Sequence, residues 1–246
     1  MINPLLLQSN KDIPFTSAKC TIHNPKIAEI ALIGEEDFHM GSRFLNFNKN
    51  DFDFKDNSDL IDKSDFEILI GIMNSKEYYK FTLKALQVLT LLFPSYIITI
   101  EEKRIKLQSI EDETKIRVID EKSYDEFREI IKQIFVLESK EDGGSYNPAN
   151  DMARKIAEKL KKGREKAAKS KGEDMKDKSL YGRIISILAV GLGKDKNILF
   201  EYTVYQLLDE YKRFQLKTSY DMNFKMRLAG ATDLDEPEDW LDNLLL

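Results

Sequence analysis

Hydrophobic residues recur at two different periods along the chain, and the change of period separates expected helices from expected strands. Between residues 64 and 92 the apolar positions follow helical spacing. Ser64 and Glu67 form a capping box that marks the start of the first of two helices. The second, over about 76–92, is apolar on most sides, so we expect it in the core, ending before Pro94.

After Pro94 the apolar residues alternate with polar ones. Three short β-branched segments, 96–100, 104–107 and 115–119, are separated by charged turns, which predicts a three-stranded antiparallel meander. A second capping box, Ser123 with Glu126, is expected to open a helix whose apolar face runs to Phe135. Upstream, residues 1–24 indicate an extended arm with a strand at Thr21–Ile22, and Asn24–Pro25 predicts a helix start.

The C-terminal half shows only helical signals. Gly143 and Gly144 make 138–147 the best boundary, and Pro148 restarts a helix to about residue 171. Residues 181–192 are apolar enough for a buried helix, and a third capping box, Thr203 with Gln206, begins a long helix that ends near Gly230. We therefore expect a predominantly helical α+β fold. It would have an N-terminal domain over 1–140, with the meander, and an all-helical C-terminal domain over 141–246.

The composition limits the classes of protein to which this chain can belong. The 246 residues include 38 basic and 43 acidic side chains, a net charge of −5 that does not favour a dedicated nucleic-acid binder. A single cysteine, Cys20, excludes an intramolecular disulfide and a thiolate zinc site. The first residues lack the features of a signal peptide, and no stretch is apolar for the ~18 residues of a membrane span. These features predict a cytoplasmic protein that does not bind membranes.

The strongest local charge lies between residues 154 and 178, where eleven basic and five acidic residues give 11 − 5 = +6. Two interpretations stay open: a contact with phosphates or an acidic partner, or a solvated helix face with i,i+4 ion pairs. No aromatic residue interrupts the run, so bases have no stacking platform and nucleic acid is not an expected partner. The candidate patch comprises Arg154, Lys155, Lys159, Lys162, Arg164 and Lys166.

The sequence motifs for phosphate binding or for a catalytic nucleophile are incomplete or absent. Gly191-Leu192-Gly193-Lys194 resembles a phosphate loop, but the position of its first glycine is Leu188, and Asp195 replaces the Ser or Thr after the lysine. We interpret these glycines as a helix terminator. No Gly-x-Ser-x-Gly turn is present for a serine nucleophile.

The sequence also lacks the ligand spacing of known metal sites. His23, His39 and Cys20 do not have the spacing of metal ligands, and the acidic run that begins at Asp51 lacks the glycine and closing glutamate of a calcium loop. We expect no catalytic residue, no metal and no cofactor, hence a protein that is not an enzyme.

The last residues differ from the rest. Trp240, the sole tryptophan, stands among six acidic side chains and is followed by Leu241 and Leu244 to Leu246. Trp240 could enter a partner's pocket, because aromatic anchors dominate binding energies, or it could cover the protein's own helical core.

An ordered set of segments resembles tail-assembly-chaperone-like proteins from the tail-morphogenesis region of phages and prophages of Gram-positive bacteria. The segments are 27–35, 146–150, 184–191, 203–209, 221–231 and 238–240. Each is weak alone, and the set spans roughly residues 25–242. The family has no catalytic residues to carry over.

The resemblance implies a non-enzymatic assembly chaperone in the host bacterial cytoplasm that binds the tape-measure or tail-tube protein, with self-association also open. Candidate contact residues are Tyr211, Phe214, Met222, Phe224, Met226 and Trp240. The alternative for the first five is an ordinary core position. Alternative functions are a structural tail or baseplate component of the virion, or a nucleic-acid-binding protein that uses residues 154–178.

Overall fold

The computed structural model describes residues 2–49, 62–137 and 179–230. In chain order its elements begin with α1 (Pro4–Leu7), β1 (Ile13–Phe15), β2 (Cys20–Ile22), α2 (Ile27–Ile33), α3 (Glu35–Leu45), α5 (Asp65–Asn74), the 3-10 helix η2 (Lys76–Tyr78) and α6 (Tyr79–Leu92). They continue with β3 (Tyr96–Glu101), β4 (Arg104–Ser109), β5 (Ile116–Ile119), α7 (Glu121–Ile134), α9 (Leu180–Leu192), α10 (Lys196–Phe200) and α11 (Val204–Leu228).

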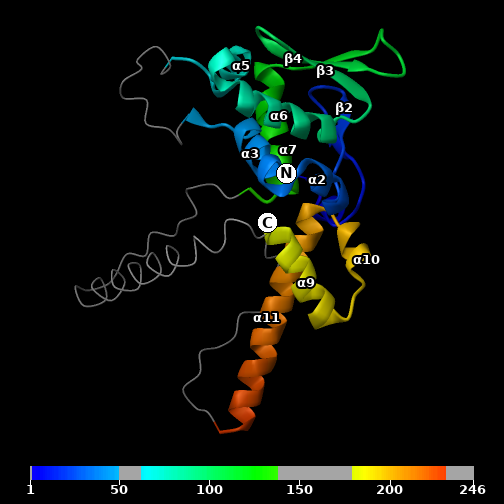
Figure 1. Ribbon diagram of the computed structural model, residues 1–246, viewed down its shortest axis with the longest axis vertical. Coiled ribbons are helices and arrows are strands. Elements are labelled where there is room, and N and C mark those ends of the chain that lie inside the picture. Colours follow the sequence, from blue (N-terminus) through cyan, green and yellow to red (C-terminus); the bar gives the residue numbers. More distant parts are fainter. Residues whose placement is uncertain (1, 50–61, 138–178, 231–246) are drawn as a thin grey trace, which may run out of the picture.

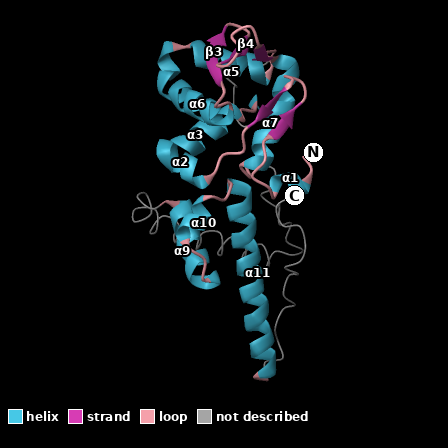
Figure 2. Cartoon of the chain, turned by 90° about the vertical axis from the view of Figure 1, so that its right-hand side faces the viewer, coloured by secondary structure: helices cyan, strands magenta, loops and turns pink. Residues whose placement is uncertain are grey.

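The fold is α+β, as the sequence predicts. The strands β3, β4 and β5 pair antiparallel in that order and lie at one end of the molecule, beside α5 and α6 (Figure 1). The helices α9, α10 and α11 lie at the other end, and α11 extends away from the body (Figures 1 and 2). A second, two-stranded sheet of β1 and β2 forms the N-terminal arm.

One connected hydrophobic core runs through the described part of the chain. The rings of Phe93 and Phe127 are stacked with their centroids 6.2 Å apart, and Phe38 meets Phe135 edge-on with a centroid distance of 4.7 Å. The buried Tyr124 hydroxyl donates to the carbonyl of Leu45 at 3.0 Å, which satisfies its polar atom inside the core. The core therefore joins α3, α6 and α7 into the body that carries the other helices.

Close packing of α3 on α6 depends on one glycine. A Cβ placed on Gly41 would lie 2.4 Å from the carbonyl oxygen of Lys84 and 2.7 Å from Cγ2 of Val88. Both neighbours belong to α6, and the carbonyl is backbone that cannot rotate away. Only glycine therefore permits this distance between the two helices.

Two of the three predicted capping boxes are confirmed and one is wrong. Ser64 accepts from the Glu67 amide and Thr203 accepts from the Gln206 amide, each at a helix start. The third helix begins earlier than predicted, because Asp120 is its N-cap and Ser123 closes the box from within the first turn. Glu126 instead accepts the backbone amides of Thr16 and Ser17, so a tertiary contact replaces the expected local one.

The helix start at Asn24–Pro25 is also wrong by two residues. α2 begins at Ile27 after Lys26, whose amide donates to the Glu29 carboxylate at 2.7 Å. Asn24 is instead buried in the extended segment that precedes it. The arm before it does pair at Thr21–Ile22 as predicted, in β2, while the short helix α1 was not expected.

The C-terminal helices follow the predicted bounds but not the predicted burial. α9 buries Tyr181, Ile184, Ile185 and Leu188, yet Val190 is 87% exposed, so only one face of this helix is covered and the expectation of a buried helix is wrong in part. Gly193 ends α9 in the left-handed conformation, which confirms the terminator. The domain boundary near residue 140 and the helix predicted from Pro148 lie outside the described residues.

Candidate partner-binding surface

The start of α9 is fixed by a carboxylate from another helix. Glu35, at the first turn of α3, accepts the backbone amide of Leu180 at 2.8 Å and that of Tyr181 at 3.3 Å, and it also accepts the Ser179 hydroxyl. Amides at a helix start lack partners within the helix, and a negative charge there is stabilising. Glu35 therefore stabilises the start of α9 together with the N-cap Ser179, whose hydroxyl accepts the Gly182 amide at 2.8 Å.

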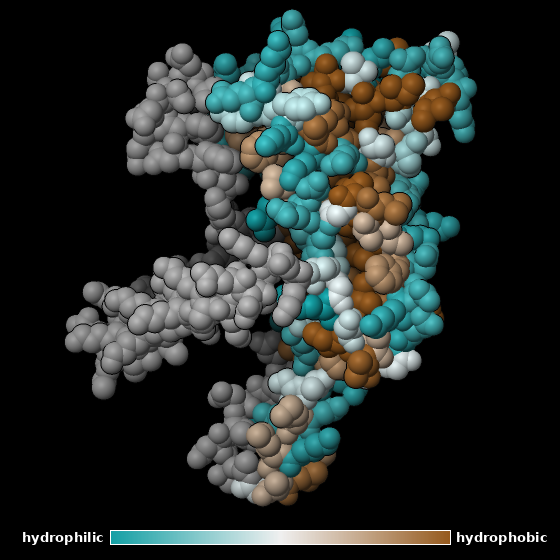
Figure 3. Space-filling model, in the orientation of Figure 1, coloured by the Kyte–Doolittle hydropathy of each residue, from teal (hydrophilic) through white to brown (hydrophobic). Residues whose placement is uncertain are grey.

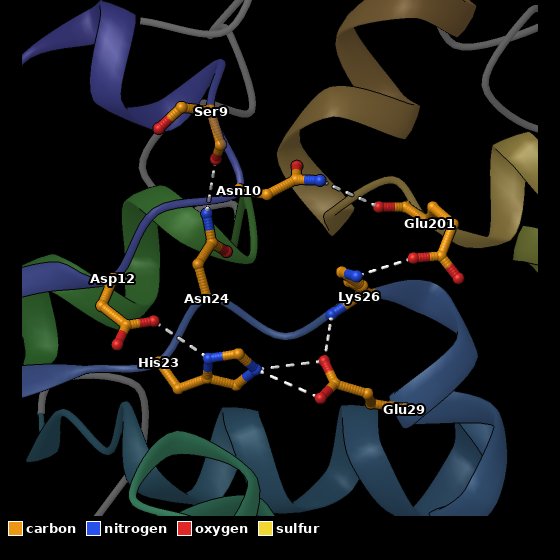
Figure 4. A network of polar contacts seen from close by, with 8 residues as sticks. All are labelled: Ser9, Asn10, Asp12, His23, Asn24, Lys26, Glu29 and Glu201. Carbon is orange, nitrogen blue, oxygen red and sulfur yellow. Dashed lines mark hydrogen bonds and ion pairs between the residues drawn. The ribbon is translucent and has the colours of Figure 1, made fainter.

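The start of α11 is fixed by backbone contacts with α2. The Ile27 amide donates to the Tyr202 carbonyl at 2.8 Å, and Lys26 forms a β-bridge with Thr203. Nζ of Lys26 lies 2.6 Å from the Glu201 carboxylate, the ion pair seen in Figure 4. The C-terminal helices are thus attached to the body mainly at the N-terminal ends of α9 and α11.

A buried carboxylate adds a third attachment, one turn into α11. Asp209 is 6% exposed and accepts from Nε2 of Gln8 and from Nε of Arg213, both at 2.9 Å. Both donors replace water at Oδ2, whereas the buried Oδ1 has no hydrogen-bond partner among the described residues. The contact ties α11 to the segment that follows α1.

A histidine supports α2 next to this junction. In Figure 4 the His23 ring lies between two carboxylates, with Nδ1 3.0 Å from Asp12 and Nε2 3.1 Å from Glu29. Burial alone lowers the pKa of the His23 imidazole, but the hydrogen bonds and negative charges of the two carboxylates raise it above its ordinary value overall. Both ring nitrogens can donate only when the ring is protonated, so the cluster favours the imidazolium.

A glycine sets the separation between α9 and α11. A Cβ on Gly191 would lie 2.3 Å from Cζ of Phe214 and 2.6 Å from Cε2, so the Phe214 ring rests directly on the backbone of α9. Beside this contact a groove of about 550 Å³ runs along α11, and Ile187 is the one described lining residue that α9 contributes. We call it the α9–α11 groove; its lining is Ile187 of α9 and Tyr211, Phe214, Gln215, Thr218, Ser219, Met222, Asn223 and Met226 of α11.

Large apolar side chains remain exposed on and beside the groove. Ile187 is 42% exposed and Met222 is 55% exposed, and Phe224 and Leu228 continue the exposed apolar residues toward the end of α11. Figure 3 shows hydrophobic residues over α9 and at the projecting end of α11 on the face drawn. Contiguous exposed apolar surface of this kind typically marks an interaction site.

The charge around the groove is positive. From Tyr211 to Leu228, α11 carries five basic residues and one acidic residue, Asp221, which gives 5 − 1 = +4. Some of these charges are already paired along the helix, as Lys217 is with Asp221 at 2.9 Å. The net sign nevertheless favours ligands that combine apolar and acidic side chains.

The candidate contact residues fall into three groups. Tyr211, Phe214, Met222 and Met226 all line the groove, the first two being partly buried against the core. Phe224 is exposed on α11 but does not line it. Trp240 and the basic patch of Arg154, Lys155, Lys159, Lys162, Arg164 and Lys166 lie outside the described residues.

Sequence reasoning missed the contribution of α9. Ile187 forms part of the groove and Gly191 permits its depth, yet both were assigned to a buried, terminating helix. The signal available in the sequence was that this helix is apolar on more than one side. Ile184 and Leu188 are buried, whereas Ile187 and Val190 are apolar residues on a side that the protein itself leaves exposed.

The residues weighed for other chemistry have structural partners. Nζ of Lys194 donates to the Glu210 carboxylate at 2.8 Å and to the Tyr202 hydroxyl at 2.9 Å, so it links the segment after α9 to α11 and to the residues just before it. Within ranges 2–49, 62–137 and 179–230, no cluster of three or more potential metal-ligating side chains is found. The candidate calcium loop from Asp51 lies outside these ranges. None of the helices described is both long and apolar enough to cross a membrane.

Comparison with models of known protein families gives a match that covers this surface. Residues 176–244 match the model of a family described as the YomV second domain, a phage-associated domain family. The matched stretch contains α9, α10 and α11. Searches of curated proteins and of solved structures give no match. The C-terminal part of the chain is thus similar to a phage-associated domain, which confirms the phage part of the resemblance; tail assembly stays a prediction.

Proposed function

We propose that this chain is a non-enzymatic phage protein that acts in tail assembly and binds an amphipathic helical segment of the tape-measure protein in the α9–α11 groove. The observation that carries the proposal is the exposed apolar groove itself, located within the residues that are similar to a phage-associated domain. A protein in this role covers an aggregation-prone helix until the tail tube polymerises around it.

The geometry of the groove suits a helix as ligand. A partner helix that lies along α11 can place apolar residues on this surface at i, i+3 and i+4 spacing, with Ile187 of α9 beside the inner end. Met222 and Met226 are unbranched and polarizable, so they can adapt to different apolar side chains along a repetitive partner. Tyr211 and Phe214 supply rigid aromatic area at the inner end.

The test is co-expression with the tape-measure protein encoded in the same phage genome. We expect a soluble complex that elutes as one peak on size exclusion. The double variant Ile187→Asp/Met222→Asp should abolish the complex, because both side chains are exposed in the groove and a buried unpaired carboxylate opposes binding. Ile97→Asp, at an exposed apolar position on β3, is the matched control and should leave the complex intact.

Two outcomes would contradict the proposal. One is elution of the two wild-type proteins in separate fractions. The other is an equal loss of the complex with Ile97→Asp and with the groove variant, because binding would then not depend on the groove. Mass spectrometry of purified virions separates the role further: an assembly chaperone is absent, whereas a structural tail or baseplate subunit is present at fixed stoichiometry.

A further inference from the structure

We infer that, in the chain without a partner, the α9–α11 groove is occupied by the chain's own acidic segment, residues 231–246, with Trp240 packed against its apolar residues. A partner would then have to displace this segment. The displacement step rests on the proposed function, whereas the occupancy of the groove does not.

The segment starts where the groove ends. α11 ends at Leu228, two residues beyond the groove residue Met226, and Gly230 has a φ of +95°, which takes the chain out of the helical path. A residue with positive φ after the last helical turn is the usual way in which a chain reverses at a helix C-terminus. The following residues can therefore return along α11 instead of continuing its axis.

The length of the segment is sufficient. The groove extends along α11 from Met226 back to Tyr211, which are 226 − 211 = 15 positions apart, or about 22 Å at 1.5 Å per residue. Ten residues from 231 to 240 span about 33 Å if extended and about 15 Å if helical. Trp240 can thus reach the middle of the groove in either conformation.

Charge and side chains both match the groove. Residues 231–246 contain six acidic and no basic side chains, opposite in sign to the +4 of α11 from Tyr211 to Leu228. Trp240, Leu241 and Leu244 have the i, i+1 and i+4 spacing of one helical face. A second copy of α11 would instead bring like charges together, so the same charge pattern disfavours self-association through this surface.

Trp240 makes the inference directly measurable, because it is the only tryptophan of the chain. In the purified full chain we expect a blue-shifted emission and protection from acrylamide quenching relative to the urea-unfolded chain. Met222→Asp should shift the emission to the red and remove most of the protection, since it places a carboxylate where Trp240 and its acidic neighbours bind. Lys225→Glu, on the exposed surface of α11, should weaken the protection through charge alone, and more so at low salt.

The controls define what would overturn the inference. Ile97→Asp should leave the emission unchanged, and far-UV circular dichroism should show that all variants remain folded. Native and unfolded chains with equal quenching, or protection unaffected by both groove variants, would refute the occupancy. Protection that rises with protein concentration would refute it too, since the segment would then bind another copy. These measurements use the chain alone, so their failure leaves the co-expression test, and the proposed function, standing.

Discussion

Both halves of α11 carry large apolar residues, but these residues are buried in the first half and exposed in the second. In residues 204–214, Val204 and Leu207 are fully buried and Asp209 is tied to Gln8, so this half belongs to the core. In residues 215–228, Phe224 is 57% exposed and Leu228 is 74% exposed. The second half extends beyond α9, and no other described helix or strand covers its end (Figures 1 and 2). Its apolar residues therefore do not serve the core.

Local contacts help to hold the projecting half helical. Side chains four residues apart pair along it, including Gln215 with Tyr211 at 2.9 Å and Arg227 with Asn223 at 2.8 Å. Such pairs contribute only about 0.2–0.5 kcal/mol each, so most of the stability comes from continuity with the packed half. Burial, and not the hydrophobic pattern alone, therefore distinguishes the residues of α11 that stabilise the fold from those that are accessible to a partner.

The largest expected effect tests this separation directly. Leu207→Ala should lower the free energy of unfolding by about 2–5 kcal/mol, because it leaves a cavity at a fully buried position. Leu228→Ala, the same change on the exposed half, should alter it by less than about 0.5 kcal/mol. Urea titrations monitored by circular dichroism measure both. Comparable losses in the two variants would mean that the projecting half is packed as tightly as the first.

A smaller effect probes the contact where the two halves meet. Gly191→Ala should destabilise by about 1–2 kcal/mol, because the clash with the Phe214 ring outweighs the gain in helix propensity. Gly71→Ala on α5 is the matched control: nothing lies within 4 Å of its Cβ position, so alanine should stabilise by about 0.5–1 kcal/mol. Thermal unfolding of the pair gives the answer, and stabilisation by both substitutions would show that Phe214 moves aside without cost.

The smallest effect concerns the body that anchors α11. His23 has a raised pKa, so its contribution to stability is complete below the unfolded value of about 6.5 and is lost as pH rises through the folded value. The pKa of His39 is lowered by burial and by Arg43, against the attraction of Glu35, so its contribution has the opposite sign and stability rises with pH through that region.

Each histidine should contribute less than about 1 kcal/mol, since both rings are partly screened by solvent. Unfolding free energies measured between pH 5 and pH 8 should therefore fall less with rising pH in His23→Gln than in the wild type. His39→Gln should show a steeper fall. Identical pH profiles for the two variants would contradict the assignment of opposite signs.

Local signals explain what the sequence predicted correctly. The meander and the boxes at Ser64 and Thr203 depend on neighbours within a few residues, which the chain order makes visible. The prediction that Ser123 is an N-cap was wrong because Asp120, three residues earlier, is the N-cap of α7. Glu126 is then not part of the cap, and it accepts the distant amide of Thr16. That contact depends on tertiary structure and has no local signature.

The same limit applies to the surface. Spacing on one helix was enough to select Tyr211, Phe214, Met222 and Met226, because helical periodicity places residues on a face. It could not select Ile187, whose role depends on how α9 meets α11. Gly193 ends α9 as predicted, but Gly191 lies within the helix, and its contact with Phe214 appears only in three dimensions.

The carboxylate of Glu35 has a consequence for how this molecule can vary. It contacts the first turn of α9 through the amides of Leu180 and Tyr181, although Glu35 and Leu180 are 145 positions apart in the sequence. A substitution at position 35 is therefore coupled to the helix that contributes Ile187 to the groove, and the two segments of the chain are expected to vary together.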